Sequence, residues 1–189
     1  NKGAALTSYL SLAGRYCVLM PNTPRGGGIS RKISTSTDRQ RLKKVLEGLN
    51  LDKGMALIIR TAVSKRTKVE IKRDFQNLIS MWEDIKNKTI KSNAPNLIHD
   101  EGSIIKRAVR DMYNSDVEEI LVQGELAFKT CKSYMKSLMP SHTKKIQQYT
   151  DDQVLLFQKF GIDTQLSDIF KPTVNLKSGG YLVINHTEA

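Results

Sequence analysis

The sequence has 189 residues, of which 39% are hydrophobic and 26% are charged, a composition typical of a folded, soluble chain. No apolar run approaches the roughly 20 residues of a membrane span, and no signal-peptide pattern is present. The formal net charge is +11, and most of it lies in residues 25–73, which hold fourteen Lys and Arg against four Asp and Glu.

This localised charge indicates a polyanionic partner, with nucleic acid as the first candidate, because neutralised phosphates release condensed counterions. A solvated lysine-rich face without a partner is the alternative. The chain begins with Asn1 rather than Met, and we expect it to be a piece of a longer protein. Cys17 and Cys131 lack the CxxC spacing of zinc sites, so we expect two buried thiols.

The first part of the chain is predicted to begin with two short strands, at residues 6–12 and 16–20. Residues 24–28 (PRGGG) are predicted to form a loop, because successive glycines lose much backbone entropy in an ordered element. Asp38 is placed to cap a helix over residues 39–49.

A continuous apolar run at residues 55–59 predicts a buried strand that ends in Arg60 and Thr61. Thr67 and Glu70 have the spacing of a capping box, which predicts a helix from there to about Ser92. We expect an apolar stripe of this helix to enter the core: Ile71, Phe75, Leu78, Trp82, Ile85 and Ile90. A change from basic to mixed composition predicts a domain boundary between about 94 and 102.

The remainder alternates in the manner of an α/β unit. The predicted elements are a strand at 97–98, a helix at 104–112, a strand at 119–122, a helix at 126–138, a strand at 146–149, a helix at 163–169, and a hairpin of 174–176 with 181–184.

Arg60 and Thr61 are the clearest candidates for a ligand-binding site. A guanidinium offers a planar fork of donors, and the adjacent hydroxyl adds another at the end of a rigid strand. Such a pair suits a phosphate, and Gly14 is a candidate for an additional backbone N–H. An arginine paired with a surface carboxylate fits the same spacing, and the sequence leaves both interpretations open.

Several segments, in order and spacing, resemble the bacterial ribonuclease E/G family. They are residues 1–7 (NKGAALT), 11–22 (SLAGRYCVLMPN), 27–31 (GGISR), 59–62 (IRTA), 105–113 (IKRAVRDMY), 118–122 (EEILV) and 178–189 (SGGYLVINHTEA). The resemblance runs the length of the chain. It implies the recognition part of a metal-dependent endoribonuclease that cuts single-stranded RNA and senses its 5′-monophosphate.

The resemblance also implies an α+β fold in three parts. Residues 1–11 correspond to the C-terminal edge of an S1 (OB-type) RNA-binding domain, residues 12–101 to a small mixed α/β 5′-sensor domain, and residues 102–189 to an RNase H-like structural subdomain. The DNase I-like catalytic subdomain would follow Ala189. We therefore expect no catalytic and no metal-binding residue in this segment, which should be inactive alone.

Four residues match the family's 5′-phosphate sensor. Arg60 and Thr61 would hold the phosphate through their side chains, and Gly14 and Val18 would contribute backbone contacts. Lys2 stands where the family has an RNA-contacting lysine. Arg25 and Arg31 are expected as further RNA contacts.

For the full-length protein the resemblance implies Mg²⁺ and structural Zn²⁺, with ligands outside this segment. It further implies a homo-oligomer in the bacterial cytoplasm, with RNA-decay proteins as candidate partners and peripheral attachment to the inner membrane as a candidate location. The alternative is a stand-alone RNA-binding or assembly module without nuclease activity.

Overall fold

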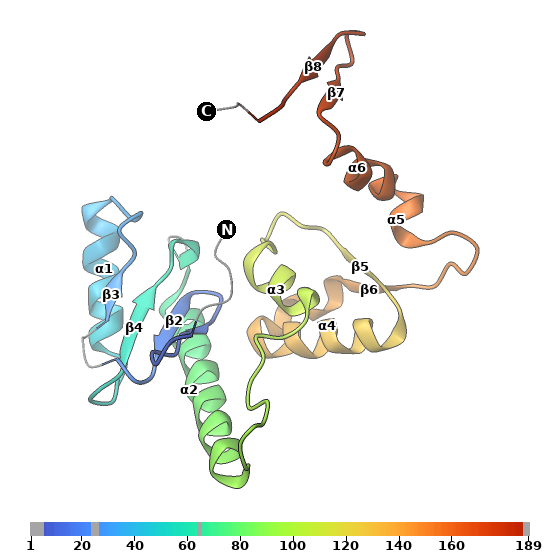
Figure 1. The fold of residues 1–189 in the computed structure, drawn as a ribbon. Helices are drawn as coiled ribbons and strands as arrows, with labels where there is room; N and C mark the ends of the chain where they lie inside the picture. The colour runs from blue at the N-terminus through green and yellow to red at the C-terminus, as the bar shows by residue number, and fades with distance from the viewer. Residues whose placement is uncertain (1–5, 24–26, 64–65, 187–189) are drawn as a thin grey trace.

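The computed structural model describes residues 6–23, 27–63 and 66–186, and it has the α+β fold expected from the sequence (Figure 1). A four-stranded sheet with two helices is followed by a second group of helices and by two small sheets. None of the helices in the described ranges combines the length and the apolar character needed to cross a bilayer.

The four-stranded sheet has the order β1-β2-β4-β3. Its strands are β1 (Leu12–Ala13), β2 (Cys17–Met20), β3 (Gly28–Ile29) and β4 (Ala56–Ile59). Strand β2 is antiparallel to both neighbours, whereas β3 is parallel to β4. Ile59 lies opposite Cys17 on one side and Ile29 on the other. The start of β2 and the ends of β3 and β4 therefore meet at one edge of the sheet.

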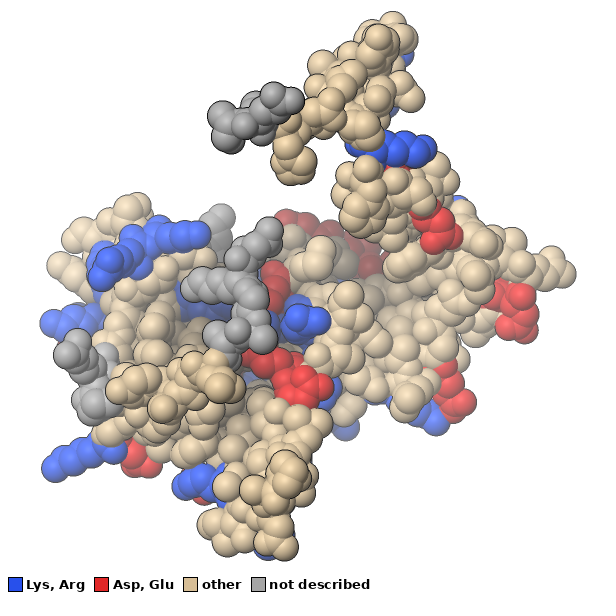
Figure 2. Space-filling model, in the orientation of Figure 1, with Lys and Arg blue, Asp and Glu red and all other residues tan. Residues whose placement is uncertain are grey.

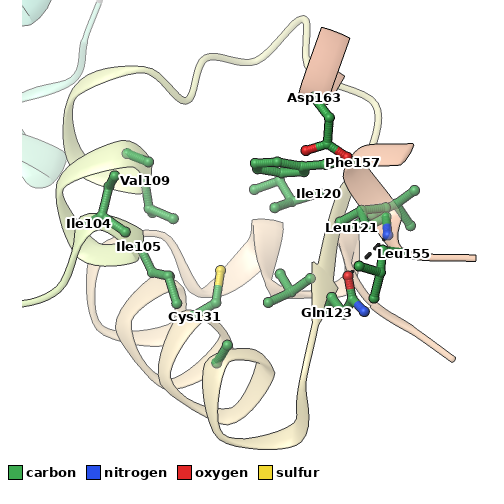
Figure 3. Close-up of a pocket in the computed structure, with 14 residues that line it drawn as sticks. Ile104, Ile105, Val109, Ile120, Leu121, Gln123, Cys131, Leu155, Phe157 and Asp163 are labelled. Carbon is green, nitrogen blue, oxygen red and sulfur yellow. Dashed lines mark hydrogen bonds between the residues drawn. The ribbon is translucent and has the colours of Figure 1, made fainter. Parts of the chain in front are cut away.

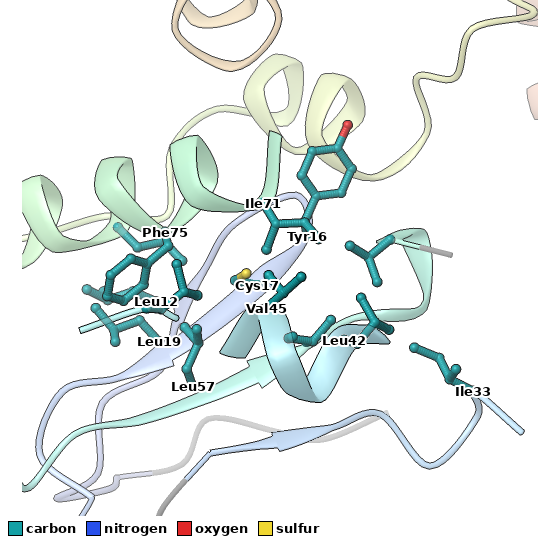
Figure 4. Close-up of a cluster of buried hydrophobic side chains, with 14 of the residues drawn as sticks. Leu12, Tyr16, Cys17, Leu19, Ile33, Leu42, Val45, Leu57, Ile71 and Phe75 are labelled. Carbon is teal, nitrogen blue, oxygen red and sulfur yellow. The ribbon is translucent and has the colours of Figure 1, made fainter. Parts of the chain in front are cut away.

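Two long helices cover the same face of this sheet. Helix α1 spans Ser36–Glu47, and α2 spans Lys68–Lys91 after the short 3₁₀ helix η1 (Thr61–Val63). Both contribute to one buried cluster (Figure 4), which includes Leu42 and Val45 from α1, Ile71, Phe75 and Leu78 from α2, and Cys17, Leu19, Leu57 and Ile59 from the strands. The alternate strand residues Val18, Met20 and Ile58 are half-buried or exposed, as the two-residue period of a strand requires.

The capping box at the start of α2 is confirmed. The N–H of Glu70 donates to Thr67 Oγ1 at 3.3 Å, and the N–H of Thr67 donates to Glu70 Oε2 at 2.8 Å. Helix α1 is also confirmed, but it begins at Ser36 with Thr35 as its N-cap, so Asp38 lies inside its first turn. A carboxylate there still stabilises the helix, because it lies near the positive end of the helix dipole.

The second group is built on the parallel pair β5 and β6 and the helices around it. Its elements are α3 (Ile104–Asp111), β5 (Ile120–Gln123), α4 (Glu125–Leu138), the 3₁₀ helix η2 (Pro140–Lys145) and β6 (Ile146–Tyr149). A smaller buried cluster joins them, with Val109, Val122, Cys131 and Met135 among its members.

The chain then continues into an arm, residues 150–186, none of which is buried. The arm contains α5 (Leu156–Lys159), α6 (Ile162–Asp168) and a hairpin of β7 (Thr173–Asn175) and β8 (Tyr181–Val183). Figure 1 shows the hairpin extending away from the rest of the chain. The predicted pairing of the hairpin is confirmed, and α5 was not predicted.

Four predictions about local structure were wrong. Residues 6–11 form no strand, and β1 contains only Leu12 from the predicted stretch, because no other part of the described chain pairs with those residues. Residues 97–98 form no strand either, and Leu97 is 80% exposed. Ile90 is 82% exposed because α2 projects past the end of the sheet there. Gly28 belongs to β3 rather than to a loop, while residues 24–26 lie outside the described residues.

Both cysteines are free and buried, as predicted, one in each cluster. Burial raises the pKa of both thiols, which keeps them protonated at neutral pH. The predicted boundaries of the three domains stay a prediction, although residues 92–103 contain no helix or strand.

Candidate functional site

The candidate site lies at the edge of the sheet where the turn between β1 and β2 meets the end of β4. The turn is held by the carboxylate of Asp74, which α2 projects into it. Asp74 accepts the N–H groups of Arg15 at 3.1 Å, Tyr16 at 2.8 Å and Cys17 at 2.9 Å, and it is only 3% exposed. Burial raises the pKa of the Asp74 carboxyl, while these three donors and the positive charge of Arg60 act in the opposite direction.

Gly14 is required in this turn by a close approach. A Cβ atom at this position would lie 2.5 Å from Asp74 Oδ2, well inside van der Waals contact. The N–H of Gly14 donates to the carbonyl of Cys17 at 2.8 Å, so it already has a partner. The predicted use of this N–H by a phosphate would therefore have to compete with a bond inside the turn.

Arg60 leaves the end of β4 directly beside this turn. Its backbone N–H donates to the carbonyl of Tyr16 at 2.8 Å, and its Nη1 donates to the carbonyl of Gly14 at 2.7 Å. The same Nη1 forms an ion pair with Asp111 Oδ1 at 2.8 Å. Within the described residues, no partner contacts Nε or Nη2, and the side chain is 33% exposed. One edge of the guanidinium is thus anchored while the other stays available.

Asp111, the last residue of α3, is itself held by its neighbour Arg110. Arg110 Nε donates to both carboxylate oxygens at 3.2 Å, and Nη2 donates to Oδ2 at 2.9 Å. The bonds from Arg110, and then those from Arg60, hold the pKa of Asp111 below its usual value. The carboxylate partner that the sequence left open as an alternative is therefore present, and the partial exposure of Arg60 leaves its role as a phosphate ligand a prediction.

Arg15 fastens the turn to the C-terminus of α3. Arg15 is 5% exposed, and its guanidinium donates to the carbonyls of Val109 at 2.9 Å, Arg110 at 3.1 Å and Tyr113. The last carbonyls of a helix have no hydrogen-bond partner within the helix and lie at the negative end of its dipole. A buried guanidinium there supplies the missing donors and a compensating positive charge. Arg110 Nη1 adds a bond back to the carbonyl of Ala13 at 3.3 Å.

The structure brings three of the four predicted sensor residues together. Thr61 follows Arg60, is exposed, and has a hydroxyl without a hydrogen-bond partner among the described residues. Gly14 contacts Arg60 directly. Val18 lies in the central strand β2, opposite Ala13 and Ile58, with its side chain on the face that the helices leave open. Their contacts with a phosphate stay a prediction.

Of the three further residues predicted to contact RNA, only Arg31 lies within the described ranges. Lys2 and Arg25 lie outside the described residues. Arg31 is exposed and follows β3, whose parallel register with β4 carries it to the same edge of the sheet as Thr61. Arg31 also lines a hollow of about 420 Å³ on the open face, together with Met20, Thr23 and Ile58.

On the face shown in Figure 2, Lys and Arg gather over one part of the molecule. In Figure 2, Lys and Arg predominate over the part that carries α1, whereas Asp and Glu are more frequent toward α5. Arg39 is partly used inside the protein, since its Nη1 donates to the carbonyls of Ser30 at 3.2 Å and Ile33 at 3.0 Å. The part of the molecule that carries α1 therefore presents an electropositive surface on the face shown.

A separate cavity of about 650 Å³ lies between α3, β5, α4 and α5 (Figure 3). Its walls are mostly aliphatic, including Ile105, Val109 and Leu121, and Gln123 closes one side by accepting the N–H of Leu156 at 3.0 Å. It contains no cluster of ionisable groups that would bind an anion.

Sequence reasoning missed Asp74, Asp111 and Arg15. Asp74 carried a signal, because an acidic residue three positions after Ile71 and four before Leu78 falls on the buried face of the helix. Asp111 and Arg15 carried none, because the partners that give them their roles, Arg60 for Asp111 and the carbonyls at the end of α3 for Arg15, are distant in sequence.

Comparisons with known proteins agree with the resemblance noted in the sequence. A model of the ribonuclease E/G family matches residues 11–189. Ribonuclease E of Haemophilus influenzae is 42% identical over 189 residues, and ribonuclease E of Escherichia coli is 42% identical over 190. Ribonuclease E of Buchnera aphidicola subsp. Acyrthosiphon pisum is 41% identical. Each comparison covers all of this chain but only 20%, 18% and 21% of the relative, so the chain spans about a fifth of their length.

Proposed function

Since this chain belongs to the ribonuclease E/G family, we propose that it is the substrate-recognition part of an endoribonuclease, binding single-stranded RNA and sensing a 5′-monophosphate. The observation that carries the proposal is the pose of Arg60. Its Nη1 is anchored by Gly14 and Asp111, while Nε and Nη2 point to no partner in the described chain. That free edge matches the bidentate geometry of a phosphate.

The surroundings favour a terminal phosphate over an internal one. A terminal monophosphate carries nearly two negative charges at neutral pH, whereas a phosphodiester carries one. The Thr61 hydroxyl and the exposed Arg31, which the register of β3 with β4 carries level with Thr61, supply further donors and positive charge near Arg60. A 5′-hydroxyl end offers none of the charge that these groups would neutralise.

Metal chemistry is proposed only for the full-length protein. Within the described ranges, no three of His, Cys, Asp and Glu lie close enough to hold an ion, so these residues do not fit a Mg²⁺ or Zn²⁺ site. We place the ligands of both ions outside residues 1–189, and we do not expect the chain alone to cut RNA. A cytoplasmic homo-oligomer that meets RNA-decay proteins and the inner membrane surface is proposed from the family alone.

The test is the substitution Arg60→Ala. We expect it to weaken binding of 5′-monophosphorylated RNA, relative to the same RNA with a 5′-hydroxyl, by about 1–3 kcal/mol, because a charge-assisted hydrogen bond is lost. Fluorescence anisotropy titrations of both RNAs at one salt concentration measure the difference.

The matched control is Lys53→Ala, which removes one exposed positive charge at the opposite edge of the sheet. It should change both affinities equally and slightly. An equal loss for both RNAs in Arg60→Ala would mean that the basic surface binds RNA without sensing its end.

A further inference from the structure

We infer that Asp111 is a positioning residue of the phosphate site: it holds the guanidinium of Arg60 so that one edge stays open to the anion. The inference rests on the proposed function, because it concerns the same arginine. Asp111 belongs to α3, outside the sheet that carries Arg60, and it was not among the predicted site residues.

An arginine needs such help because its side chain is long and flexible. A solvent-exposed arginine loses rotamer freedom when it binds, and a side chain ordered in advance avoids part of that cost. Arg60 is one-third exposed and would be mobile without contacts. Two acceptors on Nη1, Gly14 at 2.7 Å and Asp111 at 2.8 Å, fix the plane of the guanidinium.

The negative charge of Asp111 is shared between two arginines rather than taken up by Arg60 alone. Arg110 binds the same carboxylate through Nε and Nη2, so two guanidinium groups share the charge of Asp111, and Arg110 Nη1 also forms an ion pair with Glu101 Oε2 at 3.9 Å. Asp111 Oδ1 accepts from both arginines, which places the carboxylate between them and away from the free edge of Arg60.

Other contacts join α3 to the sheet without the carboxylate of Asp111. Arg15 makes three bonds to carbonyls at the end of α3, and Arg110 contacts the carbonyl of Ala13 at 3.3 Å. These contacts do not involve the Asp111 carboxylate. Its removal should therefore leave the two parts in contact and change chiefly the freedom of Arg60.

The experiment compares Asp111→Asn with Asp111→Ala in the full-length protein. Both variants remove the same negative charge, so any general electrostatic gain in RNA binding is equal in the two. Only asparagine keeps an oxygen that can accept from Arg60 Nη1. The readout is the ratio of the Kd for 5′-hydroxyl RNA to the Kd for 5′-monophosphorylated RNA, measured by anisotropy.

We expect Asp111→Asn to keep this ratio within about twofold of the wild-type value, and Asp111→Ala to lower it about fivefold, the effect of one lost hydrogen bond. Affinity for 5′-hydroxyl RNA should be equal in both variants. The matched control Asp116→Ala, an exposed acid just after α3 with only local bonds, should leave the ratio unchanged.

The outcomes separate this inference from the proposed function. If Arg60→Ala abolishes the preference while Asp111→Ala keeps it, Asp111 does not position the arginine and the proposed function stands. If Arg60→Ala keeps the preference, the proposed function itself is wrong. Asp111→Ser, too short to reach Arg60, must repeat the alanine result. A loss of affinity for both RNAs in both variants would show a folding role and overturn the inference.

Discussion

The sheet and its two helices differ sharply from the arm at residues 150–186. Both regions are rich in aliphatic and aromatic side chains, but Leu19, Leu42 and Leu57 are fully buried, whereas Tyr181, Leu182 and Val183 are each more than half exposed. The sheet buries its side chains because α1 and α2 cover one face of it. The β7–β8 hairpin has no such cover in the described chain, and a lone hairpin has little stability of its own. Apolar composition alone therefore does not make a core.

The candidate site lies in the first region, where the sheet and its two helices form a buried core. Asp74, Gly14 and Arg60 are fixed by elements that share the larger buried cluster. A phosphate clamp needs donors held within a narrow range of positions. The comparison thus predicts that substitutions of buried residues in the first region disturb binding and folding together, and that those in the arm of the 189-residue chain disturb neither.

The largest effect is expected for Leu42→Ala. Leu42 has no exposed surface and joins α1 to the sheet, so its truncation should leave a cavity and cost about 3 kcal/mol. Hydrogen exchange of the α1 amides in the 189-residue chain measures the loss. Unchanged exchange there would mean that the first region does not depend on this cluster.

A smaller loss, about 2 kcal/mol, is expected for Asp74→Ala. It removes a desolvated carboxylate but leaves the N–H groups of residues 15–17 without their acceptor. Those amides should exchange faster, and the preference for 5′-monophosphorylated RNA should fall because the turn no longer holds Arg60. Asp84→Ala, an exposed acid on the same helix, serves as the control, and equal effects of the two would refute a role for the buried carboxylate.

The smallest effect, below about 0.5 kcal/mol, is expected for Leu182→Ala in the 189-residue chain, because the side chain is already 52% exposed. The same substitution in the full-length protein sharpens the comparison. A much larger cost there would locate a surface, outside these 189 residues, that covers the hairpin.

Local patterns explain which elements could be predicted. The capping box of Thr67 and Glu70, the apolar stripe of α2 and the apolar run of β4 depend on neighbours a few residues away, and all three were found. The predicted burial of the stripe was wrong only at Ile90, where the helix extends past the end of the sheet. Strand β3 was missed because two residues that include a glycine have no pattern, and only pairing with β4 makes them a strand.

The sequence by itself determined the basic segment, the main helices and strands, and the family. It also placed a guanidinium and a hydroxyl side by side, at Arg60 and Thr61. Only the tertiary structure decided which edge of Arg60 is free, because Asp111 and Gly14, which anchor its Nη1, are 51 and 46 positions away along the chain. Helical and strand periods report on a residue's near neighbours. The acceptors that orient a long side chain belong to residues that only the fold brings close to it.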